Sequence, residues 1–270
     1  MNWSQVLTVA RTDLKQLAQA KDFWIPMAAL GCLFFVLIPT ALLVMITTVG
    51  SVGPLEQITS TLEVLPDNTQ SQIQGDTPQG RTGYALAVFL FAPVAVVVPL
   101  TISTAVGAAT IVGERERGTG EFLANSPAGV REIYIGKLIA SLVPGYMTTV
   151  IGFSLYSLVV NLTVGAEIGG WFFPTTQWWV MILWVLPPFL AICLSLVLRL
   201  SARVKSTAAA QQASGLISLP LIMIAYGQAT GALLGAWWVP ILIGAVAWAI
   251  ALFSLNRGVR SVTRARLLGV

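Results

Sequence analysis

The chain has 270 residues, of which 56% are hydrophobic and 10% are charged, with a mean hydropathy of +0.81. This composition excludes an ordinary soluble domain and predicts a membrane protein with several transmembrane helices. The formal net charge is +4, but the basic residues flank apolar runs, as positively charged cytoplasmic loops do, so nucleic acid is not an expected partner.

The N-terminal stretch, residues 1–22, has apolar side chains at helical spacing with charged side chains between them. It predicts an amphipathic helix lying in the membrane interface, with Trp3 and Trp24 at headgroup depth. Its polar, mixed-charge beginning is untypical of a cleaved signal peptide. The first span is expected at residues 23–49, and because it is longer than a ~30 Å hydrocarbon core requires, we expect it to tilt or to bend near Pro39.

Residues 50–83 are polar, and their acidic residues outnumber their basic ones. We expect an extracytoplasmic loop here, with a short surface helix starting at Pro54. A solvated connector is the favoured interpretation of this loop, and a substrate gate is the alternative. The second span, residues 84–112, contains Pro93 and Pro99, which remove backbone donors and predict a bent helix.

A charged segment, residues 113–137, separates the second span from the third, which is expected at residues 138–164. Five aromatic residues that follow predict an interfacial aromatic belt, with a ligand cradle as the alternative; they are Trp171, Phe172, Phe173, Trp178 and Trp179. The last three spans are expected at residues 178–200, 208–226 and 237–255. Glycines between the last two allow either close helix packing or a re-entrant turn; they are Gly227, Gly231 and Gly235.

The positive charges orient these six spans. With both termini in the cytoplasm, 14 of the 15 Lys and Arg residues lie on inner segments. Such a bias sets the orientation of membrane proteins. The sequence therefore predicts a multi-pass protein of the plasma or inner membrane with both termini cytoplasmic.

Side chains that catalysis or ion coupling would need are missing or lie outside the spans. The chain has no His, which removes the commonest general base and metal ligand, and no Gly-x4-Gly-Lys-Ser/Thr phosphate loop. Every charged residue is placed at a span end or in a loop, which disfavours a proton relay through the spans. Cys32 and Cys193 lie in apolar runs and are expected to be core residues. We expect no catalytic site, metal or cofactor in this chain.

The most densely charged segment runs from Glu114 to Lys137 and has eight ionic residues among 24. Acidic and basic residues alternate at its beginning, Thr119 can cap a short helix, and Ser126-Pro127 offers a second helix start. Charges of both signs beside exposed apolar residues suit docking to another protein. A solvated charged turn is the alternative.

Residues 114–123 read Glu-Arg-Glu-Arg-Gly-Thr-Gly-Glu-Phe-Leu, and Pro127 and Gly136-Lys137 follow. This stretch resembles the first cytoplasmic loop of the membrane permease subunits of type-2 ABC exporters. That loop reads approximately Glu-Arg-Glu-x-Gly-Thr-x-Glu-x-Leu, then Pro, then a Gly-Lys pair entering the next span. The chain departs from it at Gly120, where a bulky apolar residue is common. The six-span plan and the N-terminal helix extend the resemblance more loosely over the whole chain.

The resemblance implies one all-α, ABC-2-type permease domain over residues 1–270, with a cytoplasmic coupling helix between the second and third spans. It also implies a second permease subunit, the same or homologous, and two copies of a separate ABC ATPase subunit that carry ATP and Mg. It assigns the charged hinge and apolar knob that contact the ATPase to Glu114, Arg115, Glu116, Arg117, Gly118, Thr119, Glu121, Phe122 and Leu123.

These observations predict a permease subunit of an ATP-driven exporter, whose uncharged interior suits a lipid-like or amphipathic cargo better than a small ion. Two alternatives stay open. One is a membrane anchor or signalling subunit that docks an ATPase without moving cargo. The other is a secondary transporter, which is weakened by the absence of intramembrane charge and of detectable inverted repeats. The sequence singles out no substrate-binding residue.

Overall fold

The computed structural model describes residues 1–49, 67–116, 126–201 and 238–261, and in addition residues 208–209, 212, 215–216, 219 and 222–223. All regular secondary structure in these residues is helical, which confirms the all-α class. Five described stretches are long and apolar enough to cross a bilayer: Lys21–Thr48, Pro78–Thr110, Val130–Ile168, Thr176–Leu200 and Trp238–Val259. The span expected at 208–226 and the glycines at 227, 231 and 235 lie mostly or wholly outside the described residues, so the sixth span stays a prediction.

The chain begins with α1 (Trp3–Gln19). The first membrane-spanning stretch then consists of α2 (Lys21–Cys32), a π-helical turn η1 (Leu33–Leu37) and α3 (Ile38–Val49). The short helix α5 (Asp67–Gln70) precedes the second stretch, which is made of α6 (Pro78–Ala85), η2 (Leu86–Leu90) and α7 (Ala92–Glu116). The remaining elements are α9 (Val130–Ile168), α10 (Thr176–Val180), η3 (Met181–Val185), α11 (Leu186–Ser201) and α13 (Trp238–Ser261).

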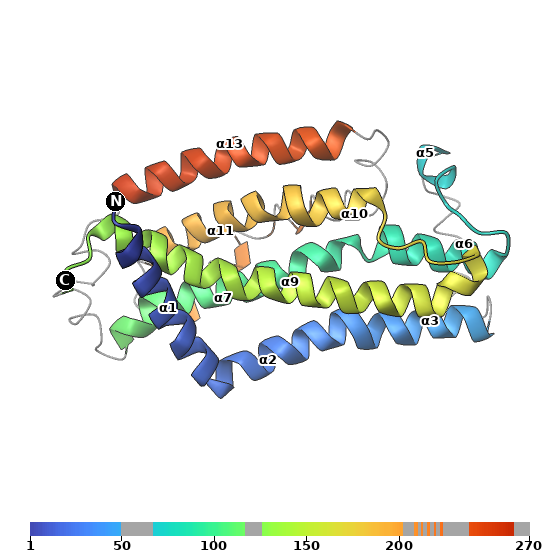
Figure 1. The fold of residues 1–270 in the computed structure, drawn as a ribbon, viewed down its shortest axis with the longest axis horizontal. Helices are drawn as coiled ribbons and strands as arrows, with labels where there is room; N and C mark the ends of the chain where they lie inside the picture. Colours follow the sequence, from blue (N-terminus) through green and yellow to red (C-terminus); the bar gives the residue numbers. More distant parts are fainter. Residues whose placement is uncertain are drawn as a thin grey trace.

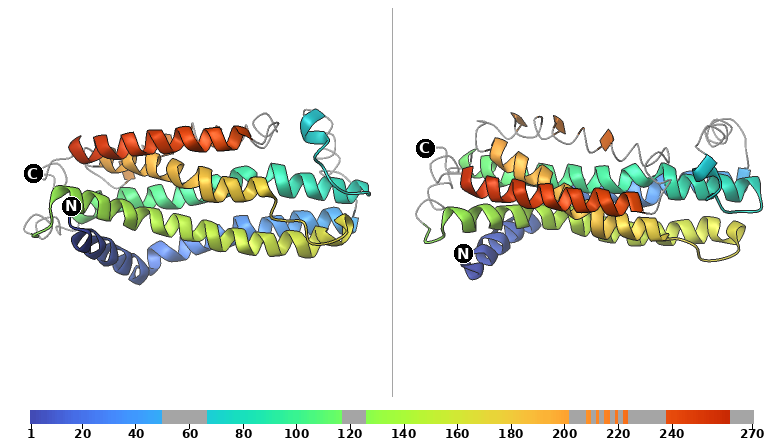
Figure 2. Two further views of the ribbon diagram at one scale, coloured as in Figure 1. Left: turned by 45° about the horizontal axis from the view of Figure 1, so that its top comes forward. Right: turned by 90° about the horizontal axis from the view of Figure 1, so that it is seen from above.

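The long helices lie side by side in one bundle, and α1 crosses one end of it at an angle (Figure 1). α9 packs against α7 and α1, and α11 packs against α7 and α13. At one end, which we call the inner end, α1 and α9 begin and α7 and α13 end (Figures 1 and 2). At the opposite, outer end, α3 ends and α6 begins. Both described ends of the 113–137 segment therefore lie on the same side of the bundle as α1.

The second membrane-spanning stretch begins earlier than the sequence predicted. Its first helix starts at Pro78, where the side chain of Thr77 caps the helix by accepting a hydrogen bond from the amide of Gly80 (3.0 Å). The last residues of the expected 50–83 loop are therefore helical. The surface helix expected from Pro54 lies outside the described residues.

The helix of the third span, α9, is longer at both ends than the expected 138–164. It begins at Val130 rather than at Ser126-Pro127, because the chain is bent at those two residues and Gly129 has the extended backbone of an N-cap. At its other end Gly169 takes the left-handed conformation, with φ 96°. Residues with a side chain rarely adopt this conformation, and glycine is the usual residue that ends a helix in this way.

Each of three membrane-spanning stretches contains a π-helical turn that ends two or three residues before a proline. The turn η1 precedes Pro39, η2 precedes Pro93 and η3 precedes Pro187-Pro188. A proline lacks an amide hydrogen, and its ring collides with the carbonyl four residues earlier. A widened turn relieves this collision, and the amide after each turn donates to the carbonyl five residues earlier instead. Pro99 lies inside α7, which continues through it.

Side chains from neighbouring helices bond to carbonyls within η2. The hydroxyl of Tyr156 on α9 donates to the carbonyl of Ala87 (2.7 Å), and Nε1 of Trp178 on α10 donates to the carbonyl of Val88 (2.9 Å). All four residues are buried. Because no water in the hydrocarbon region can replace such a bond, these donors stabilise the irregular backbone before Pro93.

An aromatic cluster surrounds this turn in the outer half of the bundle. Its four rings are buried, and the ring pairs in contact have centroids 5.0–5.9 Å apart; they belong to Phe153, Tyr156, Phe173 and Trp178. Trp171 and Trp179 are exposed, as an interfacial belt requires. The belt prediction is therefore wrong for Phe173 and Trp178, which are core residues.

Asn161 on α9 explains why Phe173 turns inward. Its Oδ1 accepts hydrogen bonds from the amides of Phe172 (2.9 Å) and Phe173 (3.0 Å), and its Nδ2 donates to the carbonyl of Phe173 (2.6 Å). One buried amide side chain thus satisfies three backbone groups of the outer turn between α9 and α10. This turn is held against the bundle rather than left in the headgroup region.

Replacing Tyr156 with Phe keeps the ring and removes the hydroxyl. We expect the free energy of unfolding to fall by about 1–2 kcal/mol, because the carbonyl of Ala87 loses its donor at a buried site. Unfolding in detergent micelles measures this. The matched control is Tyr146→Phe: that hydroxyl is half-buried and lies 3.4 Å from the carbonyl of Ile182, a long bond whose loss should change stability little. Equal losses in the two variants would contradict the argument.

Candidate functional site

The coupling segment predicted at residues 113–137 is described at its two ends. Glu114, Arg115 and Glu116 are the last residues of α7, so the helix of the second span continues into the segment at the inner end. The other predicted ATPase contacts lie outside the described residues: Arg117, Gly118, Thr119, Glu121, Phe122 and Leu123. The docking role of all nine residues, and the helix capped by Thr119, stay predictions.

Lys137 lies about two turns into α9 and is almost completely buried, with 2% of its side chain exposed. Its Nζ lies 3.4 Å from Oδ2 of Asp13 on α1 and donates a hydrogen bond to the carbonyl of Thr110 on α7 (2.7 Å). Three helices therefore meet at one ammonium group, at the last residue of the coupling segment.

Lys137 lies near the inner end of the membrane-spanning stretch Val130–Ile168, but it is buried there rather than exposed to solvent. The carboxylate of Asp13 and the carbonyl of Thr110 replace the water that this ammonium would otherwise need. A buried ion pair adds little net stability, but removing one partner leaves an uncompensated charge and costs roughly 3–5 kcal/mol. The sequence pattern did not reveal the pair because Asp13 is 124 residues away along the chain.

Gly136 allows α1 to approach α9 closely. A Cβ atom at this position would lie 2.8 Å from Cβ of Val9 and 3.0 Å from the carbonyl oxygen of Val6. Real side chains do not tolerate the first of these distances. The glycine of the Gly-Lys pair is therefore a point where the two helices approach closely.

Glu132 binds the beginning of α1. Its Oε1 accepts a hydrogen bond from the amide of Asn2 (3.0 Å), and the side chain of Asn2 in turn caps α1 by accepting one from the amide of Ser4 (3.1 Å). We call Asp13 on α1 together with Glu132, Gly136 and Lys137 on α9 the α1 clamp. The four-residue spacing of Glu132 and Gly136 puts both on one helix face, and this spacing is the signal in the sequence that could have indicated a shared partner.

The α1 clamp sets how α1 is rotated about its axis. Val6, Ala10 and Asp13 are the buried residues of the helix. Its exposed residues include apolar and basic ones: Trp3, Leu7, Arg11 and Lys15. An interfacial helix has this combination of side chains on its free surface. By fixing this rotation, the clamp keeps these four side chains exposed, and the predicted membrane contact of residues 1–22 depends on them.

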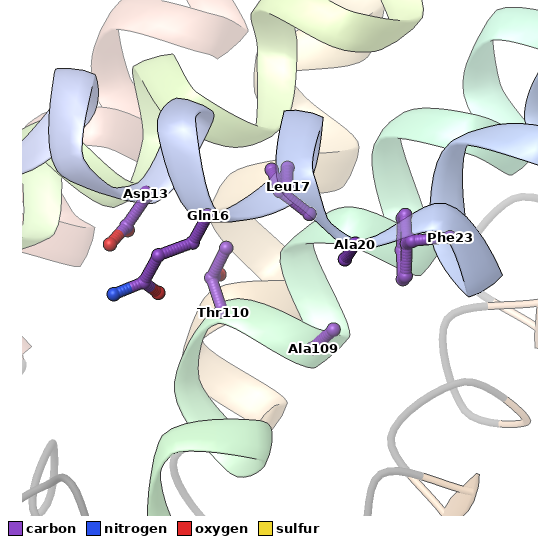
Figure 3. Close-up of a pocket in the computed structure, with 7 residues that line it drawn as sticks. All are labelled: Asp13, Gln16, Leu17, Ala20, Phe23, Ala109 and Thr110. Atoms are coloured by element: carbon purple, nitrogen blue, oxygen red, sulfur yellow. The ribbon is translucent and has the colours of Figure 1, made fainter.

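A pocket of about 80 Å³ lies beside the clamp, between α1 and the end of α7. The side chains of Asp13 and Gln16 extend from α1, and Thr110 lies near them on α7 (Figure 3). The pocket is lined by Asp13, Gln16, Leu17, Ala20, Phe23, Ala109 and Thr110. Its volume suits roughly two or three water-sized groups, so it is too small to enclose a lipid-like molecule. The packing of α1 is therefore close on α9 and looser toward α7.

A second polar cluster joins α9, α11 and α13. The hydroxyls of Tyr134 and Ser195 lie 2.9 Å apart, the hydroxyl of Ser254 donates to Ser195 Oγ (3.1 Å), and Ser195 Oγ donates to the carbonyl of Ser254 (3.2 Å). All three side chains are buried. Hydrogen bonds of this kind hold membrane helices together, so α13 is attached to α9 through α11.

The described part of the chain contains no group of three or more His, Cys, Asp or Glu side chains arranged to hold a metal ion. The polar groups of the inner end bond to one another and to backbone carbonyls of neighbouring helices. The role of these bonds is structural: they connect the end of α7 and the beginning of α9 to α1.

A family model described as "ABC-2 family transporter protein" matches residues 7–240 of the chain. The matched region contains the coupling segment and all four residues of the α1 clamp. No curated protein matches the chain.

Replacing Gly136 with Ala tests the close approach of α1 to α9. We expect a loss of about 1–3 kcal/mol in stability because the new methyl group overlaps the side chain of Val9. Trypsin should also cut faster after Arg11 and Lys15 as α1 detaches. The matched control is Gly215→Ala, where a Cβ meets nothing within 4 Å; there neither thermal unfolding nor the cleavage rate should change. Unchanged cleavage of the Gly136 variant would contradict the contact.

Proposed function

Because the chain belongs to the ABC-2 family of transporter proteins and is thus the permease component of an ABC transporter, we propose that it is a subunit of an ATP-driven exporter. In this proposal, residues 113–137 receive movement from an ATPase subunit and pass it to the membrane-spanning helices. The cargo is lipid-like or amphipathic and leaves the cytoplasm.

The observation that carries this proposal is the meeting of three helices at the inner end, inside a chain that the family model matches. α7 leads into the coupling segment, α9 leads out of it, and α1 is clamped to α9. A force applied to residues 113–137 therefore acts on two spans and on α1 together. A solvated turn between two spans would not need such an attachment.

Membership of the family implies association with an ABC ATPase subunit. The chain has no phosphate-binding loop of its own. We propose that two copies of the ATPase subunit bind ATP and Mg, and that a second permease subunit, the same or homologous, completes the assembly. In this arrangement Glu114, Arg115, Glu116 and the residues that follow them to Leu123 contact the ATPase.

The cargo class follows from the side chains between the two ends of the bundle. Residues 23–48, 82–110, 138–164, 178–198 and 238–256 contain no Asp, Glu, Lys or Arg. Spans that move protons or small ions through charged relays keep such residues. The proposed interior therefore suits an apolar or amphipathic molecule.

Co-expression with ABC ATPase subunits encoded in the same genome tests the proposal directly. The chain should co-purify with one of these ATPases, and the complex in vesicles should move a fluorescently tailed phospholipid across the bilayer when ATP is supplied. Association without lipid movement would favour the anchor or signalling alternative. Failure of any ATPase to associate would overturn the proposal.

Labelling of single cysteines tests the orientation. In a chain whose native Cys32 and Cys193 are replaced by Ala, we expect Ser126→Cys to react from the cytoplasmic side and Trp171→Cys from the outer side, because the positive residues lie on inner segments. A membrane-impermeant maleimide applied to cells and to inverted vesicles measures this. Labelling of the Ser126 variant on intact cells would place the coupling segment where no cytoplasmic ATPase could reach it.

Replacing Phe122 with Asp tests the docking role of the coupling segment. The charge should prevent Phe122 from entering an apolar groove of the ATPase, because burying an unpaired carboxylate is costly. We expect normal insertion into the membrane and at least a tenfold loss of ATP-dependent lipid movement. Phe122→Leu keeps an apolar side chain and should retain transport. Wild-type transport by the Asp variant would remove Phe122 from the interface.

A further inference from the structure

The two halves of the first span are held differently. In α2, the inner half, Gly31 is the buried residue. In η1 and α3, the outer half, Phe35, Leu43 and Ile46 are buried in the main core. The inner half packs less closely than the outer half: Met27 and Leu30 touch the core but are only partly buried, and residues 21–26 have no buried side chain. Its connection to α1 therefore contributes to where it lies.

α1 is directly connected to α2. One residue, Ala20, separates the two helices; its amide donates to carbonyls of the last turn of α1, and its carbonyl accepts from the amides of Phe23 (2.9 Å) and Trp24 (3.2 Å). A connection this short, bonded in both directions, leaves α2 little freedom to move independently of α1. The position of α1 thus sets the position of the inner half of the first span.

We infer that the Asp13–Lys137 ion pair transmits movement of the coupling segment to the inner half of the first span. The inference rests on the proposed function. Lys137 is the last residue of the coupling segment and lies on α9, and its ammonium binds the carboxylate of Asp13 on α1. A displacement of the first turns of α9 therefore carries α1, and α1 carries α2. Lys137 and Asp13 act as positioning residues in this transmission.

An ion pair transmits such a displacement better than apolar packing alone. Apolar contacts between α1 and α9, at Val6 and Val9, are non-directional and allow sliding. If α1 slid along α9, the buried ammonium would separate from its carboxylate at a site with little water to replace it, and the attraction between unlike charges opposes this. The hydrogen bond from Lys137 to the carbonyl of Thr110 (2.7 Å) holds the ammonium in register with α7.

Replacing both charged residues with neutral ones distinguishes an effect on transmission from an effect on folding. Asp13→Asn and Lys137→Met each leave one charge buried and should reduce recovery of the folded complex. The double variant Asp13→Asn/Lys137→Met leaves no buried charge, so its thermal unfolding should return toward that of the native chain. The double variant keeps the contacts of Glu132 and Gly136 with α1 but lacks the ion pair, which is the part of the connection that the inference holds responsible for transmission.

The experiment measures the distance between spin labels on Ile25 in α2 and Leu252 in α13, which are both exposed. The native Cys32 and Cys193 are replaced by Ala in all variants. The permease is studied in complex with its co-purified ATPase, with and without a non-hydrolysable ATP analogue and Mg. We expect the analogue to change this distance in the native-charge chain and not in the double variant. The matched control, Lys15→Met/Asp22→Asn, alters the same residue types at exposed positions and should retain the change.

A second label pair tests the inference without any variant of the ion pair. Leu7 on α1 and Met147 on α9 are exposed, and the distance between labels there should stay constant on binding of the analogue, because α1 moves with α9. A change at Leu7–Met147 as large as that at Ile25–Leu252 would overturn the inference. So would a normal Ile25–Leu252 change in the assembled double variant. Absence of any analogue-dependent change in the native-charge complex would instead overturn the proposed function, and the inference with it.

Discussion

A lysine ammonium buried between helices must keep its hydrogen-bond partners, and at the inner end of this protein that requirement determines how three helices meet. Lys137 on α9 bonds to the carboxylate of Asp13 on α1 and to the carbonyl of Thr110 on α7. Its neighbour Gly136 removes the side chain that would keep α1 away. The Gly-Lys pair therefore joins the coupling segment to α1, in addition to leading the chain into the third span.

The outer half of the bundle depends on a different constraint, which is that backbone groups in hydrocarbon need partners within the protein. Prolines interrupt three membrane-spanning stretches, and a π-helical turn precedes each interruption. Buried donors on neighbouring helices, Tyr156 and Trp178, bond to carbonyls of one such turn, and aromatic rings fill the space around it. Asn161 then holds the outer turn against the same cluster. The outer half is thus interlocked by side chains from several elements.

In this permease of the ABC-2 family, the two constraints hold the outer and the inner half of the bundle in different ways. The interlocked outer half keeps the helices together, and the first span takes part in it through Phe35, Leu43 and Ile46. The inner half of that span is attached through α1, whose own attachment is the α1 clamp. In the proposed function, movement that begins at residues 113–137 reaches the inner halves of several helices while the outer packing is retained.

Composition and periodicity determined the helical class, the amphipathic helix near the N-terminus and the described membrane-spanning stretches, because these features depend on neighbouring residues and on the cost of placing charge in hydrocarbon. The motif at residues 114–123 likewise led to the family, whose match extends over residues 7–240.

Other features required the tertiary structure, because they join residues far apart in the chain: Asp13 and Lys137, or Asn161 and the turn that buries Phe173. Sequence reasoning placed Lys137 where the chain enters the third span, although a lone lysine is costly inside a membrane protein. Only the fold brings to it the carboxylate and the carbonyl that make its burial possible.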